Sequence, residues 1–155
     1  MHATSEWGSK MKDNTAITRP IVFYDGGCPL CRREIMHYQR IDRERRIQWT
    51  DIQQEPDTLQ AHGLSWQQAM QRMHVRDSDG RMASGANAFA ALWRHIPRYS
   101  FLARIVALPG INWTAEQVYS VFARRRYRSR CSDQVCADSD PLQGNRVTTD
   151  PAGRY

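Results

Sequence analysis

The chain has 155 residues and a net charge of +6, and 41% of its residues are hydrophobic, which suits one domain with a modest core. No apolar run approaches the length of a membrane span, and residues 1–19 lack the apolar stretch of a secretory signal. We therefore expect a cytoplasmic protein with a flexible lead over residues 1–19, one domain over residues 20–131 and a disordered tail over residues 132–155.

The first elements of the domain follow the order strand, helix, strand. Residues 20–24 (PIVFY) form a short β-rich run that ends in Asp-Gly-Gly, which predicts a buried strand followed by a turn. The next segment, CPLCRREIMHY, has its Cys, Cys, Ile and Tyr at helical spacing, and Pro29 is a typical first residue of a helix. Ile47 and Trp49 alternate in a second strand, so residues 20–52 predict a βαβ unit with parallel strands.

The middle of the chain predicts one or two short helices and a hairpin. Residues 55–71 are polar and rich in glutamine, and their apolar anchors are Leu59, Leu64, Trp66 and Met70. In the segment 73–84, Asp79 and Gly80 form the turn of a hairpin between two short strands. Residues 85–96 then predict a helix with an apolar stripe, which ends before Pro97.

Two further helices follow in the sequence pattern. Residues 100–108 form a short apolar helix that Pro109 ends, and Thr114 with Gln117 has the spacing of a capping box for the next helix. The core face expected for that helix consists of Val118, Val121 and Phe122. Together the elements predict an α/β fold with a thioredoxin-like sheet (βαβ plus ββα) and additional C-terminal helices.

The pair Cys28 and Cys31 is the strongest chemical signal, because a close cysteine pair in a reducing cytoplasm is more often catalytic or metal-binding than structural. Cys28 falls at or beside the N-cap of the predicted helix, where free amides favour a thiolate, the species that attacks disulfides. We expect Cys31, one turn further along, to be more buried and less reactive, and to resolve the mixed disulfide. This chemistry would fail if Cys28 were sealed inside the protein or lay in mid-helix.

Asp25 lies three residues before Cys28 and has several possible roles. Its charge alone would raise the pKa of the thiol. We rank first a role as hydrogen-bond acceptor in the turn, and second a role as proton acceptor for Cys31 during resolution. The glycines Gly26 and Gly27 would let the backbone of a partner approach closely.

Two alternatives remain open beside dithiol chemistry. The first is a zinc site, whose candidate ligands are Cys28, Cys31, Cys131, Cys136, His37 and His74. The helix start at Pro29 and the loose spacing of the second cysteine pair count against it. That second pair could also form a regulatory disulfide, although two free thiols explain it as well. The second alternative is nucleic-acid binding by the basic segments 40–46 and 124–130, which a solvated turn and a helix C-terminus also explain.

The segment YDGGCPLC resembles the DxxCxxC signature of the DCC family, the thiol-disulfide oxidoreductases of the DUF393 type. The segments HVRDSDGRMASGANAFAAL and LPGINWTAEQVYSVFARRRYR resemble further parts of that family, so the resemblance covers residues 20–131. It implies a thioredoxin-like fold and a redox dithiol at Cys28 and Cys31, with Asp25 as the third signature position. Two positions depart from the pattern, since Asn87 stands where Asp is common and Arg125 where Asn is common.

From these observations we expect a protein-disulfide reductase that needs no dissociable cofactor and no metal. Its partners would be a thiol or disulfide substrate and an upstream reductant, without a membrane or a nucleic acid. Thioredoxins place a cis-proline opposite the cysteine pair, whereas no proline precedes the strand near Met73. The residues expected to face the substrate are Gly26, Gly27, Pro29, Gly85 and Ala86.

Overall fold

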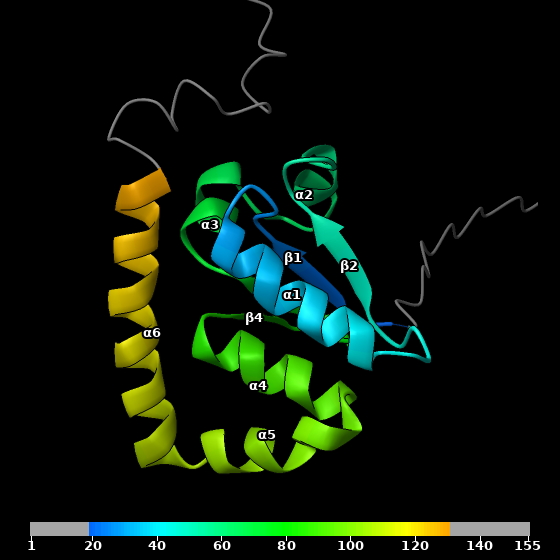
Figure 1. The fold of residues 1–155 in the computed structure, drawn as a ribbon, viewed down its shortest axis with the longest axis vertical. Coiled ribbons are helices and arrows are strands. Elements are labelled where there is room, and N and C mark those ends of the chain that lie inside the picture. The colour runs from blue at the N-terminus through cyan, green and yellow to red at the C-terminus, as the bar shows by residue number, and fades with distance from the viewer. Residues whose placement is uncertain (1–18, 131–155) are drawn as a thin grey trace, which may run out of the picture.

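The computed structural model describes residues 19–130 (Figure 1), so Cys131, Cys136, the predicted lead and the predicted tail lie outside the described residues. The described part contains a four-stranded sheet in the order β2-β1-β3-β4. Its strands are β1 (Ile21–Tyr24), β2 (Gln48–Asp51), β3 (His74–Arg76) and β4 (Met82–Ser84). The helix α1 (Pro29–Ile41) connects β1 to β2, and these two strands are parallel, as the βαβ pattern predicts.

The other strand pairs are antiparallel, with β3 beside β1 and β4 beside β3. The β3–β4 hairpin turns at residues 77–81, where Gly80 has a φ of 85° and its amide donates to the Asp77 carbonyl. This mixed sheet with its helices confirms the predicted α/β architecture, a thioredoxin-like fold with added C-terminal helices.

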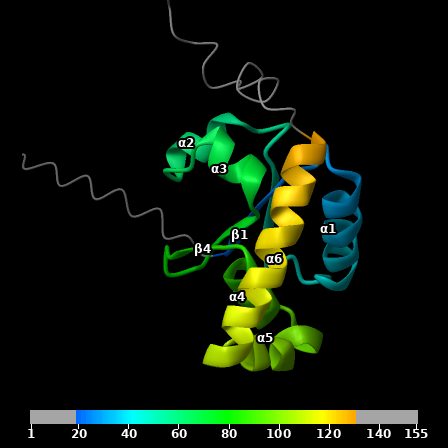
Figure 2. The ribbon, with the colours of Figure 1, turned by 90° about the vertical axis from the view of Figure 1, so that its left-hand side faces the viewer.

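Alternation along β1 divides the core between the two faces of the sheet. Ile21 and Phe23 pack with residues of α2 (Asp57–Ala61) and α3 (Trp66–Gln71) on one face. Val22 packs on the other face with residues of α1 and α4 (Ala86–His95). Figure 2 shows α1 and the α2–α3 pair on opposite sides of the sheet. The four apolar anchors predicted for α2 and α3 are all buried: Leu59, Leu64, Trp66 and Met70.

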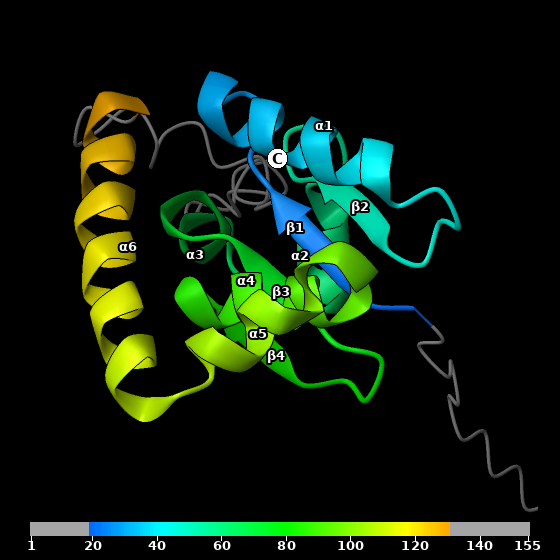
Figure 3. The same ribbon diagram turned by 60° about the horizontal axis from the view of Figure 1, so that its bottom comes forward.

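After α4 the chain forms a 3-10 turn at η1 (Pro97–Tyr99), the short α5 (Ser100–Val106) and the long α6 (Pro109–Arg130). Figures 1 and 3 show α6 standing beside the domain, with its beginning at α5 and its C-terminal end near the start of α1. No helix in the region 19–130 has the length and apolar character needed to cross a bilayer.

The prediction for α6 is wrong in two respects. The helix begins at Pro109 rather than at Thr114, because proline suits the first helical position, and the Thr114 hydroxyl donates to the Gly110 carbonyl within the helix. Two residues of the expected core face are largely exposed, Val118 at 66% and Val121 at 57%, whereas Phe122 is 38% exposed. The face that packs on the domain is mostly polar, and its members are Glu116, Tyr119, Ala123 and Arg126.

Candidate active site

The turn between β1 and α1 is held by two carboxylates. The Gly27 amide donates to Asp25 Oδ1 over 3.0 Å, and the Cys28 amide donates to the Asp25 carbonyl over 3.2 Å. The Gly26 amide donates to Asp51 Oδ1 over 2.9 Å, and a Cβ atom at Gly26 would overlap the Asp51 carboxylate. Asp25 thus accepts a hydrogen bond from the turn through its side chain.

Cys28 is the N-cap residue of α1, with Pro29 in the first helical position, as predicted. Burial by itself raises the pKa of the Cys28 thiol, but the amides of Cys31 and Leu30, the Cys31 thiol and the Arg126 guanidinium outweigh it and bring the pKa below its usual value. The helix N-terminus therefore favours a thiolate at Cys28, which is the electrostatic feature that disulfide attack requires.

The pKa of Cys31 is shifted in the direction opposite to that of Cys28. Burial raises the pKa of Cys31 to about 11, and the neighbouring Cys28 thiolate adds to the rise, whereas Arg126 opposes it. The expected order of burial is wrong, however, because Cys28 is only 4% exposed and Cys31 is half-buried. Cys28 therefore lies at the helix N-terminus as the proposed chemistry requires, but it is almost sealed, so attack by its sulfur requires a movement that uncovers it.

Arg126, which comes from α6, brings a positive charge to the cysteine pair. Its Nη1 lies 3.2 Å from the Cys31 sulfur, and its Nη2 donates to the Met70 carbonyl over 2.5 Å. The same Nη1 lies 3.7 Å from Asp25 Oδ2, and the Arg126 side chain is only 8% exposed. Burial alone would lower the pKa of Arg126, but Cys31, Tyr119 and Asp25 raise it, so the guanidinium is a permanent positive charge at the pair.

A second arginine of α6 reaches the same turn. Arg130 Nε lies 3.4 Å from Asp25 Oδ2, and its guanidinium fills the space in which a side chain at Gly27 would stand. Asp25 Oδ1 also accepts from the Gln53 amide over 2.9 Å, whereas Asp25 Oδ2 has no hydrogen bond and faces the two guanidinium groups. One oxygen of the Asp25 carboxylate therefore accepts hydrogen bonds from the turn and from Gln53, and the other lies beside two guanidinium groups.

Arg126 and Arg130 are not among the site residues predicted from the sequence, which places them at a solvated helix end. A signal was present, because Glu116, Tyr119, Arg126 and Arg130 share one helical face at spacings of three and four or their sums. Glu116 forms an ion pair with Arg72, and the Tyr119 hydroxyl accepts from the Met73 amide over 2.9 Å. A run of five arginines within seven residues gives no indication of which one points inward.

Tyr119 also bears on the missing cis-proline. No peptide bond is cis in the part of the chain that the structure describes. The Met73 amide, which precedes β3 at the place where thioredoxins present backbone to a substrate, is bonded to the Tyr119 hydroxyl of α6. The Met73 amide therefore already donates its hydrogen bond within the protein.

An apolar cavity of about 50 Å³ opens beside the sulfur of Cys31. Its lining includes Leu30, Met73, Phe89 and Phe122 together with Arg126. A wider groove of about 480 Å³ continues from it between α1, α4 and α6, and shares Phe89 and Phe122 with the smaller cavity. The cavity and the groove give Cys31 an apolar approach.

The other residues expected at the substrate occupy different surroundings. Gly27 and Pro29 are exposed beside Cys28, whereas Gly26 is buried against Asp51. Ala86 lines the wider groove. Gly85 has a φ of 64°, and the side chains of Arg72 and Glu116 cover it.

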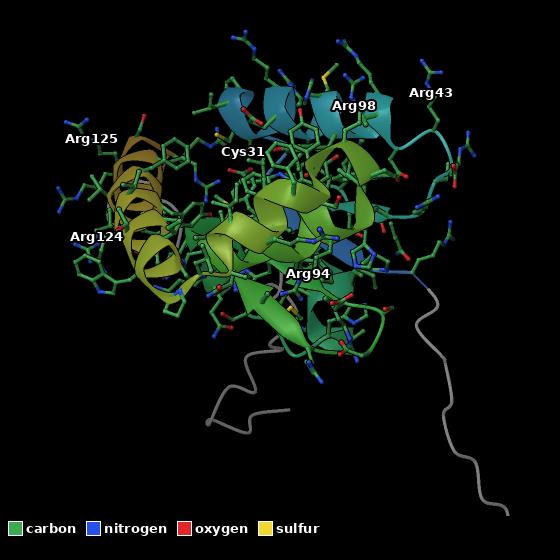
Figure 4. All side chains as sticks on the ribbon, turned by 90° about the horizontal axis from the view of Figure 1, so that it is seen from below. Cys31, Arg43, Arg94, Arg98, Arg124 and Arg125 are labelled. Atoms are coloured by element: carbon green, nitrogen blue, oxygen red, sulfur yellow. The ribbon has the colours of Figure 1, made fainter. Side chains whose placement is uncertain are left out.

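The two positions that depart from the family pattern lie away from the sulfurs. Asn87 Oδ1 accepts from the Asn112 amide over 2.7 Å at the surface. Arg125 is exposed, and Figure 4 shows it pointing outward from α6.

The residues of the zinc alternative do not meet within the described region. His37 Nε2 is hydrogen-bonded to the Tyr99 hydroxyl, and His74 Nδ1 is hydrogen-bonded to the Arg72 carbonyl. Among residues 19–130, no group of three or more His, Cys, Asp or Glu side chains could hold a metal ion. Cys131 and Cys136 lie outside this range.

The basic segments of the nucleic-acid alternative lie far apart. Figure 4 shows Arg43 and the neighbours Arg124 and Arg125 at opposite sides of the molecule. The two segments therefore do not combine into one basic surface, and one residue of the second segment, Arg126, is buried at the cysteine pair.

Comparison with known proteins agrees with this geometry. The model of the DCC1-like thiol-disulfide oxidoreductase family matches residues 22–132. An uncharacterized chloroplastic protein of Arabidopsis thaliana is 32% identical over 132 residues, which cover 83% of this chain and 60% of that protein. The chain thus spans less than two thirds of the length of this relative, and no solved structure matches it significantly. The chain belongs to the DCC1-like thiol-disulfide oxidoreductase family.

Proposed function

We propose that this protein is a protein-disulfide reductase that acts through the Cys28–Cys31 dithiol. One observation carries the proposal: Cys28 sits at the N-cap of α1 with a lowered pKa, and Cys31 lies one helical turn away with a raised pKa. The two sulfurs therefore differ in the way that a two-step exchange requires, with one thiolate ready to attack and one thiol held in reserve.

The reaction consists of two displacements. The Cys28 thiolate attacks one sulfur of a substrate disulfide, which forms a mixed disulfide and releases the first substrate thiolate. The Cys31 thiolate then attacks the Cys28 sulfur, which forms the Cys28–Cys31 disulfide and releases the second substrate thiolate. An external dithiol, acting as the upstream reductant, returns the pair to its reduced form. No dissociable cofactor takes part, and the reducing cytoplasm is the location we propose for this cycle.

Access to Cys28 requires a side chain to move. Cys28 is 4% exposed, and the Arg130 guanidinium lies over Gly27, the residue just before it. Arg130 is about one third exposed and ends the described helix, so it can swing aside at little cost. A substrate would then meet Gly27 and Pro29, whereas Gly26 and Gly85 support the turn and the start of α4, and Ala86 lines the approach to Cys31.

The test uses the reduction of a protein disulfide substrate with dithiothreitol as the reductant, and measures thiols released with time. Cys28→Ser should abolish the acceleration, and Cys31→Ser, reduced beforehand and mixed with the substrate after removal of dithiothreitol, should accumulate a covalent mixed disulfide between Cys28 and the substrate, visible by mass spectrometry. The matched control is Met36→Ser on the exposed side of α1, which should retain full activity. Full activity of Cys28→Ser would end the proposal.

A further inference from the structure

We propose that Arg126 is a catalytic residue of the resolving step, where its guanidinium is the counter-charge for the Cys31 thiolate and Asp25 balances it in the rest of the cycle. This inference rests on the proposed function and deepens it, because it assigns a role to a residue 95 positions away from Cys31 in the chain.

The geometry holds the guanidinium at the reacting sulfur. Nη1 is 3.2 Å from the Cys31 sulfur, which is within hydrogen-bond range for sulfur, and Nη2 is fixed on the Met70 carbonyl in the last turn of α3. Carbonyl groups in the last turn of a helix lack partners within the helix and carry partial negative charge, so they suit a cation. The side chain is thus anchored at one nitrogen and presents another to the sulfur.

Burial makes this charge effective. Because Arg126 is 8% exposed, water screens its interaction with Cys31 only weakly. A buried cation needs a compensating anion, and Asp25 Oδ2 at 3.7 Å is the carboxylate in that position. The Arg126–Asp25 pair therefore accounts for the charge while Cys31 is a thiol or part of a disulfide.

The cycle itself changes the surroundings of Cys31. In the free dithiol, the Cys28 thiolate accepts a hydrogen bond from Cys31 and repels a second negative charge, and both effects keep Cys31 protonated. Once Cys28 is in a mixed disulfide, its negative charge is gone and both effects end. Arg126 remains in place, so the balance at Cys31 moves toward the thiolate at the stage when that thiolate is needed.

The step balances without any further reactant. Cys31 loses its proton to solvent, and its sulfur attacks the Cys28 sulfur of the mixed disulfide. The bond between Cys28 and the substrate sulfur breaks, and the substrate leaves as a thiolate with the electron pair. Arg126 neither gains nor loses a proton. The titratable or charged groups around Cys31 in this step are Cys28, Tyr24, Glu34, Tyr119 and Arg126, with Asp25 and Arg130 behind them.

The experiment follows the two displacements separately with dithiobis(nitrobenzoate) as the probe. Attack by Cys28 releases one coloured thiolate, and resolution by Cys31 releases the second, so a stopped-flow trace has two phases. The background is the full chain with Cys131→Ser and Cys136→Ser, which removes the other two thiols. The variants are Arg126→Gln, Arg126→Lys and the matched control Arg125→Gln, whose side chain points away from the domain.

An opposite charge at this distance shifts a pKa by one or more units, and the higher nucleophilicity of the more basic thiolate offsets part of that loss, so Arg126→Gln should slow the second phase at pH 7 about threefold or more. The midpoint of its pH profile should rise, whereas the first phase should change less. Arg126→Lys should recover part of the rate, and Arg125→Gln should match the parent. An unchanged second phase, or equal slowing of both phases, would overturn the inference.

Loss of Arg126 removes one of the two guanidinium groups beside the buried Asp25 carboxylate and leaves only Arg130, which can destabilise the fold. A second comparison therefore uses Asp25→Asn with and without Arg126→Gln, since the double variant has no unpaired buried charge. The second phase should be slower in the double variant than in Asp25→Asn alone. Equal rates in these two proteins would contradict the role assigned to Arg126. If the parent protein releases no second thiolate at all, the dithiol mechanism of the proposed function fails. If the parent shows two phases and Arg126→Gln leaves the second phase unchanged, only the role assigned to Arg126 fails.

Discussion

The order in which Cys28 and Cys31 react with iodoacetamide tests whether thiolate formation or exposure governs this site. Exposure favours Cys31, which is half-buried, over Cys28, which is 4% exposed. The pKa values favour Cys28, whose pKa lies below the ordinary 9.0, over Cys31 at about 11. The two effects therefore predict opposite orders of alkylation.

The magnitude follows from the difference in pKa. At pH 7, a thiol with a pKa of about 11 is ionised to about one part in ten thousand, whereas one below 9.0 is ionised to more than about one part in a hundred. The lower pKa also makes a weaker nucleophile, by a factor of about ten over two units. A net preference of more than about tenfold for Cys28 remains, and we expect Cys28 to be labelled first.

The assay uses less than one equivalent of label per molecule at pH 7, followed by tandem mass spectrometry of the peptide that contains both cysteines. Repeating it from pH 6 to pH 10 gives the pKa of the first thiol from the rate profile. Arg130→Ala, which uncovers the turn, should speed labelling of Cys28 and leave the midpoint of the profile nearly unchanged. Equal labelling, or prior labelling of Cys31, would refute the reasoning that the amides at the helix start control reactivity.

Two further predictions concern the turn before the cysteines. Gly26→Ala places a Cβ atom in the Asp51 carboxylate and should lower the free energy of unfolding by roughly 1–3 kcal/mol in chemical denaturation. Its control is Gly110→Ala, where the added Cβ meets open space near the start of α6 and stability should be unchanged or slightly higher. Asp25→Asn should lower the pH midpoint of the resolving phase if Asp25 is the counter-ion of Arg126, because a negative charge near a thiolate raises its pKa. A proton-accepting role for Asp25 predicts the opposite, a slower resolving phase at neutral pH, so the stopped-flow profile of this variant distinguishes the two.

The sequence was sufficient for the part of the fold in which local pattern and tertiary structure agree. In the β1–α1–β2 unit, the strand residues are apolar, Pro29 marks the helix start, and both cysteines fall where the amides are. The burial of the two sulfurs was not predictable in the same way. It depends on Arg126, Arg130 and the cavity residues of α4 and α6, which come from positions far along the chain.

For α6 the rule that apolar residues face the core led to the wrong face, and the reason lies in what the helix covers. Most surface helices pack on an apolar core, so their apolar stripe is the buried one. The surface that α6 covers carries several polar groups, which are the Met73 amide, the Arg72 guanidinium, the Met70 carbonyl and the Asp25 carboxylate. The helix covers these groups partly or wholly, so each of them needs a partner.

The polar face of α6 supplies those partners in register, with Tyr119, Glu116 and Arg126 on the amide, the guanidinium and the carbonyl in turn. The same alignment that satisfies the buried groups fixes the Arg126 guanidinium at the Cys31 sulfur, because one nitrogen is bound to Met70 and the next faces the thiol. Docking of α6 and the electrostatics of the dithiol are therefore consequences of one set of contacts. A helix chosen for an apolar interface could cover this surface only by leaving buried polar groups without hydrogen bonds, at a cost of about 1–3 kcal/mol for each.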